Sequence, residues 1–221
     1  MKIKAIIFDL DNTLIDFIKM KQEACKAAVK AMIKNGLRLP FKKAYKKLME
    51  TYFKVGIESD KAFEKFLESQ GFLNEKILAA GINAYLEKKQ KFLKPYPKVK
   101  QTLRKLRKLG LKLAIVTDAP KLKAYQRVLA LGIDEYFDFL IGKEDTGKEK
   151  TSLEPLKLAL KKLELKPEEV LLVGDSVERD IKPAKKLGIK TVLAKYGQER
   201  KERGRADFEI KSIEELLKIV R

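Results

Sequence analysis

Hydrophobic positions follow two different patterns along the chain. Residues 3–8 form a mostly apolar run, which predicts a buried strand that ends at Asp9. From about residue 16 to residue 93 the apolar positions recur at helical spacing, and no strand pattern appears. Helices are expected there over about 18–35, 41–54, 60–70 and 74–93.

From residue 98 onward, short apolar runs alternate with amphipathic segments. The amphipathic segments predict helices over 99–110, 122–132, 153–163, 178–188 and 212–220. The apolar runs predict strands over 111–117, 137–141, 169–174, 190–194 and 207–210. Strands that alternate with helices of this length are typical of repeated β-α-β units.

This alternation predicts the fold class and the domain organisation. Successive β-α-β units build an α/β fold with a doubly wound, parallel, Rossmann-like sheet. The first strand belongs to that sheet, although about 75 helical residues separate it from the next unit. We therefore expect a core made of residues 1–15 and 94–221, with residues 16–93 as an all-helical domain inserted after the first strand.

Composition removes several kinds of chemistry. The chain has no histidine, which excludes Ser-His-Asp triads, histidine general bases and histidine-ligated zinc. Its one cysteine, Cys25, excludes an internal disulfide and a cysteine-built metal cluster. The apolar runs are far shorter than the roughly 20 residues that cross a bilayer, so no membrane partner is expected and the cytoplasm is the expected setting. Acid–base and metal chemistry must then use Asp, Glu, Lys, Tyr or Cys.

A strong positive charge raises the question of nucleic-acid binding. The chain has 50 Lys and Arg against 31 Asp and Glu, a net charge of +19. Residues 16–90 carry +7 of this charge and the rest +12, in proportion to length, without a basic tail or an aromatic-rich basic stripe. No nucleic-acid partner is therefore expected, and the charge favours anionic substrates. Abundant Lys and Glu, with one Cys and no Trp, is also typical of thermophile proteins.

Three of the predicted strands end in polar residues. The first is followed by DLDNT at residues 9–13, another ends in VTD at 116–118, and a third ends in GDS at 174–176 with Asp180 one turn later. Each group alone is compatible with an ordinary turn or a helix cap. The carboxyl ends of parallel strands meet at one edge of a sheet, where function collects in such folds. Crowded carboxylates there predict a site for a hard divalent cation such as Mg²⁺.

These residues also carry a resemblance to a known family. The segments 9–13, 116–118 and 174–180 resemble motifs one, two and four of the haloacid dehalogenase-like (HAD) hydrolase superfamily. The third motif of that family is a lysine before a helix, and Lys150 fits by its distance to the following helix, although the usual proline after it is absent. Lys148 and Lys143 compete for this assignment. A helical insert between motifs one and two is similar to the C1-type cap of the family.

The resemblance implies a chemical role for the first motif and its metal. Asp9 is expected to be the nucleophile that forms an aspartyl-phosphate. Asp11 is expected to protonate the leaving oxygen and then to deprotonate the hydrolytic water. Mg²⁺ is the expected cofactor, held by Asp9, the backbone carbonyl of Asp11 and Asp175.

Further residues are expected to support this chemistry. The Thr117 hydroxyl, the neighbouring backbone N–H groups at Asp118 and the Lys150 ammonium are expected to hold the phosphoryl oxygens. Asp180 and Ser176 are expected to support the metal site from behind its direct ligands. The helical insert is expected to close over Asp9 with hinges near residues 15–16 and 94–97, and to set specificity.

A second acid two positions after the nucleophile separates phosphoryl transfer from dehalogenation within the family. Because Asp11 is present, the expected activity is that of a Mg²⁺-dependent phosphatase, a phosphoric monoester hydrolase acting on a small phosphorylated metabolite. Triose phosphate and phosphoglycolate are the substrates that the resemblance favours, and the enzyme is expected to be a monomer or a homodimer. The alternatives are a phosphomutase of the β-phosphoglucomutase type and a catalytically silent binding protein with a HAD-like fold.

Overall fold

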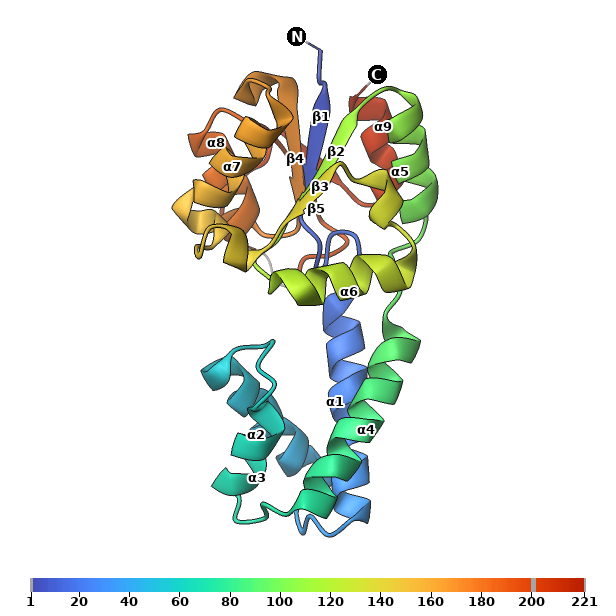
Figure 1. Cartoon of the computed structure of the whole chain (residues 1–221), viewed down its shortest axis with the longest axis vertical. Coiled ribbons are helices and arrows are strands. Elements are labelled where there is room, and N and C mark those ends of the chain that lie inside the picture. Colours follow the sequence, from blue (N-terminus) through green and yellow to red (C-terminus); the bar gives the residue numbers. More distant parts are fainter. Residues whose placement is uncertain (1, 200–201, 221) are drawn as a thin grey trace. The chain divides into compact units, whose positions relative to one another are not determined.

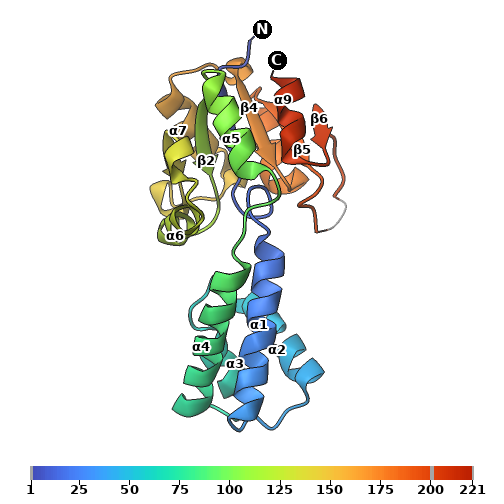
Figure 2. The same ribbon diagram turned by 90° about the vertical axis from the view of Figure 1, so that its right-hand side faces the viewer.

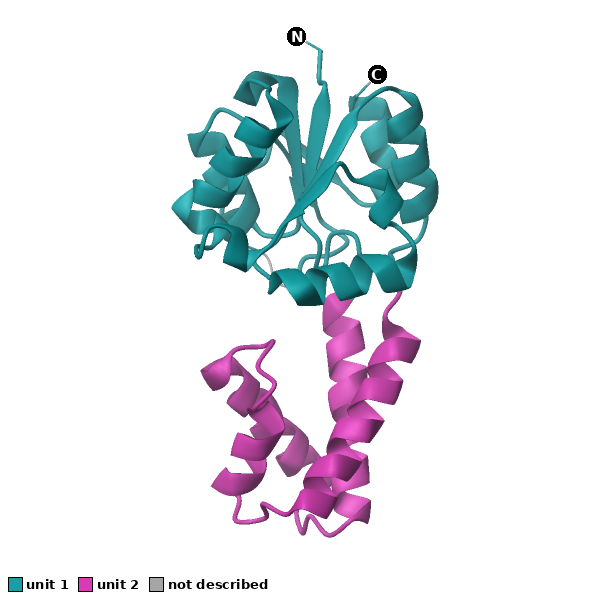
Figure 3. Ribbon diagram, viewed as in Figure 1, with its two compact units in different colours: residues 1–16, 95–221 teal, residues 17–94 magenta. Residues whose placement is uncertain are grey.

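The computed structural model describes residues 2–199 and 202–220, which divide into two compact units (Figure 3). Unit 1 comprises residues 1–16 and 95–221, and unit 2 comprises residues 17–94. Within the described part of the chain, no helix is both long enough and apolar enough to cross a membrane.

Unit 1 is built on a parallel sheet. Its strands are β1 (Ala5–Phe8), β2 (Lys112–Val116), β3 (Phe139–Ile141), β4 (Val170–Gly174), β5 (Lys190–Ala194) and β6 (Phe208–Ile210). They are ordered β3-β2-β1-β4-β5-β6 and every neighbouring pair is parallel, which confirms the predicted fold class. The chain winds from β1 through β2 to β3 and then returns to place β4 on the other side of β1. The winding therefore reverses between β1 and β4, where such folds place their sites.

Helices cover both faces of this sheet, with α7 (Glu154–Leu163) and α8 (Lys182–Lys186) on one face and α5 (Val99–Lys108) and α9 (Leu216–Ile219) on the other (Figure 1). Because both faces are covered, β1 and β4 are buried along their whole length. This explains why their sequences are continuous apolar runs instead of alternating ones. Helix α6 (Lys121–Leu131) follows β2 and packs against β3 and the turns beside it.

Two of the predicted helices in unit 1 are interrupted. Residues 178–188 form a wide π-helical turn, Val177–Ile181, followed by α8. The turn is wide because the backbone N–H groups of Ile181 and Lys182 donate to carbonyls five residues earlier, those of Ser176 and Val177. Residues 212–220 begin as a 3₁₀ turn, Ile213–Glu215, before α9. Further 3₁₀ turns are Asp134–Tyr136, Lys143–Asp145, Lys150–Ser152 and Pro167–Glu169.

Unit 2 is helical, as its spacing of apolar residues predicts. It contains α1 (Phe17–Lys34), α2 (Phe41–Val55), α3 (Ala62–Ser69) and α4 (Glu75–Phe92). Helices α1 and α4 lie side by side in both views (Figures 1 and 2). Gly81 permits this close packing, because a Cβ atom there would lie 2.2 Å from the Met32 Cε. The Asn74 side chain caps α4 by accepting from the backbone N–H groups of Lys76 and Ile77.

Candidate active site

The nucleophile candidate lies where β1 ends. The backbone N–H of Asp9 still donates to the Val173 carbonyl of β4, so the neighbouring strand holds the start of this residue. The chain then turns sharply, with Asn12 in the left-handed region at φ 64° and its N–H donating to the Ile15 carbonyl. Left-handed backbone is tolerated by asparagine better than by most residues. This turn places Asp9 and Asp11 in a short loop directly after a buried strand.

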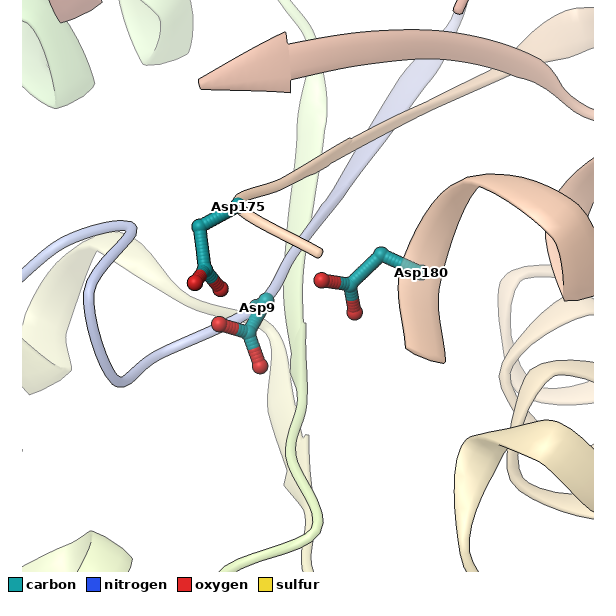
Figure 4. Close-up of side chains that lie close together, drawn as sticks. All are labelled: Asp9, Asp175 and Asp180. Atoms are coloured by element: carbon teal, nitrogen blue, oxygen red, sulfur yellow. The ribbon is translucent and has the colours of Figure 1, made fainter. Parts of the chain in front are cut away.

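Three buried carboxylates converge at the switch point of the sheet (Figure 4). One oxygen from each of Asp9, Asp175 and Asp180 lies within 4.8 Å of the others. The three residues are only 6%, 5% and 1% exposed, respectively. Asp9 follows β1, Asp175 follows β4, and Asp180 comes from the wide turn after β4. The structure thus brings together the acids that the motifs placed at separate strand ends.

Lys150 is the lysine that the structure places in this cluster. Its Nζ donates to Asp9 Oδ1 at 2.5 Å and to Asp180 Oδ1 at 2.5 Å, and the residue is 2% exposed. Lys143 and Lys148 are exposed. Instead of the family's proline, a 3₁₀ turn and Leu153 in the left-handed region at φ 71° lead from Lys150 into α7.

The oxygens of Asp9 and Asp180 are held by specific donors. Asp9 Oδ2 accepts from the Thr13 hydroxyl at 3.0 Å, so both oxygens of Asp9 have hydrogen-bond partners. Asp180 Oδ2 accepts from the Ser176 backbone N–H at 3.0 Å. Asp180 is therefore engaged by Lys150 and by the backbone, which is consistent with the supporting role expected for it.

The electrostatics of the cluster are those of crowded acids. Burial, together with the charges of Asp9 and Asp180, raises the pKa of the Asp175 carboxyl above its usual range. Burial also raises the pKa of Asp180, with Lys150 acting in the opposite direction. Burial lowers the pKa of Lys150, but Asp180 and Asp9 outweigh it, and the net pKa is raised. The lysine therefore stays charged and offsets part of the negative charge.

A hard divalent cation fits these donors. Asp175 Oδ1 is buried, and among the described residues no hydrogen-bond donor reaches it. A buried carboxylate oxygen without a donor is costly unless a cation binds it. The available ligands are oxygens, because the chain has no histidine and Cys25 is buried in the core of unit 2. Such a donor set suits Mg²⁺ better than zinc or copper.

The second strand end contributes Thr117 and Asp118. Thr117 is buried, and its hydroxyl accepts from the Ala119 backbone N–H at 3.2 Å, which leaves the hydroxyl proton able to reach a phosphoryl oxygen. Asp118 Oδ1 accepts from the Lys150 backbone N–H at 2.8 Å. The Asp118 side chain thus anchors the segment that carries Lys150.

The backbone of Ser176 contacts the acidic cluster, whereas its hydroxyl contacts Glu202. The backbone N–H donates to Asp180, as described above. The hydroxyl donates to Glu202, whose Oε2 lies 3.0 Å away. Glu202 Oε2 also accepts from the Glu178 backbone N–H at 3.0 Å, so this glutamate ties the wide turn to the segment after β5. Sequence reasoning did not single out Glu202, which lies outside every motif.

Asp11 is paired with a buried arginine that sequence reasoning missed. Arg127 on α6 is 2% exposed, and its Nη1 donates to Asp11 Oδ2 at 2.6 Å. One sequence signal could have revealed it. Ala124, Val128 and Leu131 form the buried face of α6, and Arg127 occupies a position on that same face. A charged residue at an inward helical position requires a partner.

The loop of the first motif is also held by the segment after β5. The Tyr196 hydroxyl donates to the Thr13 carbonyl at 2.8 Å, and Tyr96 packs edge-on against the Tyr196 ring. A Cβ atom on Gly197 would lie 1.6 Å from the Asn12 carbonyl oxygen. Only glycine therefore permits this approach, and no motif pointed to it in advance.

Together these side chains form a site suited to phosphoryl transfer. A carboxylate nucleophile candidate, a second carboxyl two residues later, a buried ammonium and an acidic pair able to bind a cation share one edge of the sheet. In-line displacement at phosphorus requires these groups: an attacking oxygen, charge neutralisation and an acid for the leaving oxygen.

The chain is similar to known proteins along nearly its whole length. A sequence profile of the haloacid dehalogenase-like hydrolases matches residues 6–194. The chain is 38% identical over 222 residues to a glyceraldehyde 3-phosphate phosphatase of Methanocaldococcus jannaschii, covering 99% of this chain and 97% of that protein. It is 30% identical to a phosphoglycolate phosphatase of Aquifex aeolicus, covering 98% and 96%. Among solved structures, a putative β-phosphoglucomutase from Thermotoga maritima has a similar fold, with TM-score 0.75, 22% identity and coverage of 99% and 98%.

Proposed function

The chain belongs to the haloacid dehalogenase-like hydrolases, and from this premise we propose that it is a Mg²⁺-dependent phosphatase of a small phosphorylated metabolite. The observation that carries the proposal is the buried Asp9, oriented by Thr13 and Lys150, with a second acid at Asp11. A dehalogenase has no leaving oxygen to protonate and does not need that second acid. Near-complete alignment with a phosphatase of 38% identity supports the same assignment.

In the first proposed step, an Asp9 carboxylate oxygen attacks phosphorus. The new bond joins this oxygen to phosphorus, and the bond from phosphorus to the ester oxygen breaks. Asp11 gives its proton to the departing oxygen, so that an alcohol leaves instead of an alkoxide. The Lys150 ammonium lies 2.5 Å from Asp9 Oδ1 and orients this carboxyl group for attack.

In the second step, water hydrolyses the aspartyl-phosphate. Asp11, now a carboxylate, takes a proton from the water as it attacks phosphorus, and the Asp9–phosphorus bond breaks. Inorganic phosphate leaves, and Asp9 returns to a carboxylate while Asp11 is again protonated. The two acids therefore regain their starting states after each turnover.

The remaining residues bind the phosphoryl group and the cation. The Thr117 hydroxyl, the backbone N–H groups around Asp118 and the Lys150 ammonium bind the phosphoryl oxygens. Asp9, Asp175 and the Asp11 backbone carbonyl would hold Mg²⁺. When bound, Mg²⁺ would supply charge neutralisation for the phosphoryl group.

Substrate choice is assigned to unit 2. We propose that residues 17–94 are a C1-type cap, with hinges at residues 15–16 and 94–97. The proposed substrates are glyceraldehyde 3-phosphate and, second, phosphoglycolate, because proteins with these names align along nearly the whole chain. We further propose the cytoplasm as the setting, because phosphorylated metabolites of this size are made there.

A phosphatase screen tests this function. Purified protein with Mg²⁺ is incubated with glyceraldehyde 3-phosphate, phosphoglycolate, glucose 6-phosphate and p-nitrophenyl phosphate, and released phosphate is measured. We expect kcat/KM for glyceraldehyde 3-phosphate or for phosphoglycolate to exceed that for glucose 6-phosphate by about tenfold or more. Lack of turnover with every ester would refute the proposal, and phosphate transfer to a sugar without net release would indicate a phosphomutase.

The role of Asp11 makes a separate prediction about leaving groups. Asp11→Asn is expected to slow phosphoenzyme formation by alkyl esters on the order of 10²–10⁴-fold, the usual contribution of one general acid. The effect on p-nitrophenyl phosphate should be much smaller, because its phenolate leaves readily without a proton. The rate of this first step is measured in single turnover, since Asp11 also serves as the base in the second step.

The exposed Asp134→Asn variant is the matched control for this experiment and should leave both rates unchanged. Equal slowing of the two esters by Asp11→Asn would assign Asp11 to positioning or metal binding instead of proton transfer.

A further inference from the structure

We propose that Arg127 is a positioning residue that orients the Asp11 carboxyl for proton transfer, an inference that rests on the phosphatase function proposed above. Arg127 belongs to α6 and lies 116 positions from Asp11 in the sequence. Its Nη1 donates to Asp11 Oδ2 at 2.6 Å. No motif of the family contains this residue.

Burial makes an arginine at this position costly. Arg127 is among the largest fully buried side chains of the described chain, and it lies on the same face of α6 as Ala124 and Val128. A guanidinium cannot lose its charge in a protein, so it must be compensated where it stands. Because buried ion pairs are often no more stabilising than apolar residues of similar volume, packing alone does not account for an arginine here.

The ion pair fixes the orientation of the Asp11 carboxyl group. Asp11 stands in the turn after β1 and not in a strand, and its side chain is 20% exposed. An arginine N–H that donates to Oδ2 disfavours a proton on that oxygen, because the arginine N–H and the carboxyl O–H would then face each other. The proton that Asp11 transfers is thereby assigned to Oδ1. Arg127 thus selects both the rotamer of Asp11 and the oxygen that acts.

The helix that carries Arg127, α6, is held in place at its start. The Lys121 backbone N–H at its start donates to Glu144 Oε2 at 2.6 Å, and the Lys121 Nζ pairs with Asp145 Oδ1 at 2.5 Å. Gly142 packs so closely that a Cβ atom there would lie 2.6 Å from the Lys121 Cα. The start of α6 is therefore fixed to the turn after β3, three residues beyond Asp118. A positioning residue on a fixed helix can hold the Asp11 carboxyl more precisely than one on a loop.

Three variants test the proposal in single-turnover phosphoenzyme formation with glyceraldehyde 3-phosphate and p-nitrophenyl phosphate. Arg127→Gln is expected to slow the alkyl ester about 10–100-fold more than the aryl ester, since misplacing a catalytic group by about 1 Å costs this much. KM should change by less than about threefold, because Arg127 acts through Asp11. Arg127→Lys, which keeps the positive charge on a shorter side chain, should give an intermediate rate. The exposed Arg104→Gln on α5 is the control and should match the wild type.

A double-mutant cycle separates positioning from a merely structural role. In the Asp11→Asn background, Arg127→Gln should cause no further slowing with the alkyl ester, because the group it positions is already inactive. Thermal unfolding of the same proteins identifies any variant that has lost its fold. If Arg127→Gln is unfolded, the test uses Arg127→Lys, which should slow the alkyl ester more than the aryl ester. Equal slowing of both esters, or additive slowing in the Asp11→Asn background, would overturn the role of Arg127 while leaving the phosphatase intact. A wild-type protein without activity on any phosphate ester would overturn both proposals.

Discussion

Replacing Asp9 with asparagine is expected to lower phosphatase turnover by roughly 10⁴–10⁶-fold, the range seen when one member of a covalent catalytic group is removed. An amide cannot attack phosphorus to form the acyl phosphate. The fold should survive, because the amide oxygen can still accept from Lys150 and the Thr13 hydroxyl can accept from the new amide N–H. Lys150 also keeps its ion pair with Asp180. Phosphate release and thermal unfolding are measured on the same preparation.

Two further variants complete this experiment. Asp9→Glu keeps the charge but moves the carboxylate by one methylene, so it should also be inactive, because in-line attack does not tolerate that displacement. Asp134→Asn makes the same chemical change at an exposed position of unit 1 and should retain full activity. Substantial turnover by folded Asp9→Asn protein would remove Asp9 from the nucleophile role.

Removal of divalent metal is expected to abolish turnover, with a loss of about 10³-fold or more that Mg²⁺ restores. A metal that neutralises phosphoryl charge contributes several kcal/mol to the transition state, which corresponds to a loss of this size. The cluster of Asp9, Asp175 and Asp180 provides hard oxygen ligands and no soft ones. Activity is measured after chelation with EDTA and again after Mg²⁺ is added back.

Stability provides a second readout of the same site that does not depend on turnover. Saturating Mg²⁺ should raise the unfolding temperature of the wild type, since a ligand at 100 times its Kd stabilises by about 2.7 kcal/mol. Asp175→Asn should lose this Mg²⁺-dependent rise. Without metal the variant should be at least as stable as the wild type, because the substitution removes one of three crowded carboxyl groups. An EDTA-treated enzyme that keeps its rate, or an Asp175→Asn variant that keeps the Mg²⁺ response, would contradict the metal assignment.

Those residues of the candidate site that stand directly after strands could be predicted from the sequence. Asp9, Thr117 and Asp175 each stand directly after an apolar run, and parallel strands deliver their ends to one edge of the sheet. Lys150 was predicted from its spacing to the next helix, with two nearby lysines as competitors. Its position between Asp9 and Asp180 emerges only from the folded chain, because three lysines within eight residues have the same local sequence character.

The partners of the other contributors could not be predicted, because they are remote in the chain. Arg127 meets Asp11 across 116 positions, and Ser176 meets Glu202 across 26. Glycine is required at position 197 only because a Cβ atom there would collide with the Asn12 carbonyl oxygen. Local periodicity carries no information on such contacts.

The order of apolar and polar residues therefore determined the parallel sheet, the helical insert and the strand ends at which acids appear. These features arise from local periodicity and burial, since a strand covered on both faces must be apolar throughout and a covered helix must be apolar on one side. The tertiary structure decided which lysine meets Asp9, which arginine holds Asp11 and which glycine admits the first-motif loop. These contacts join segments that are far apart in the chain, and such segments come into contact only once the core has packed.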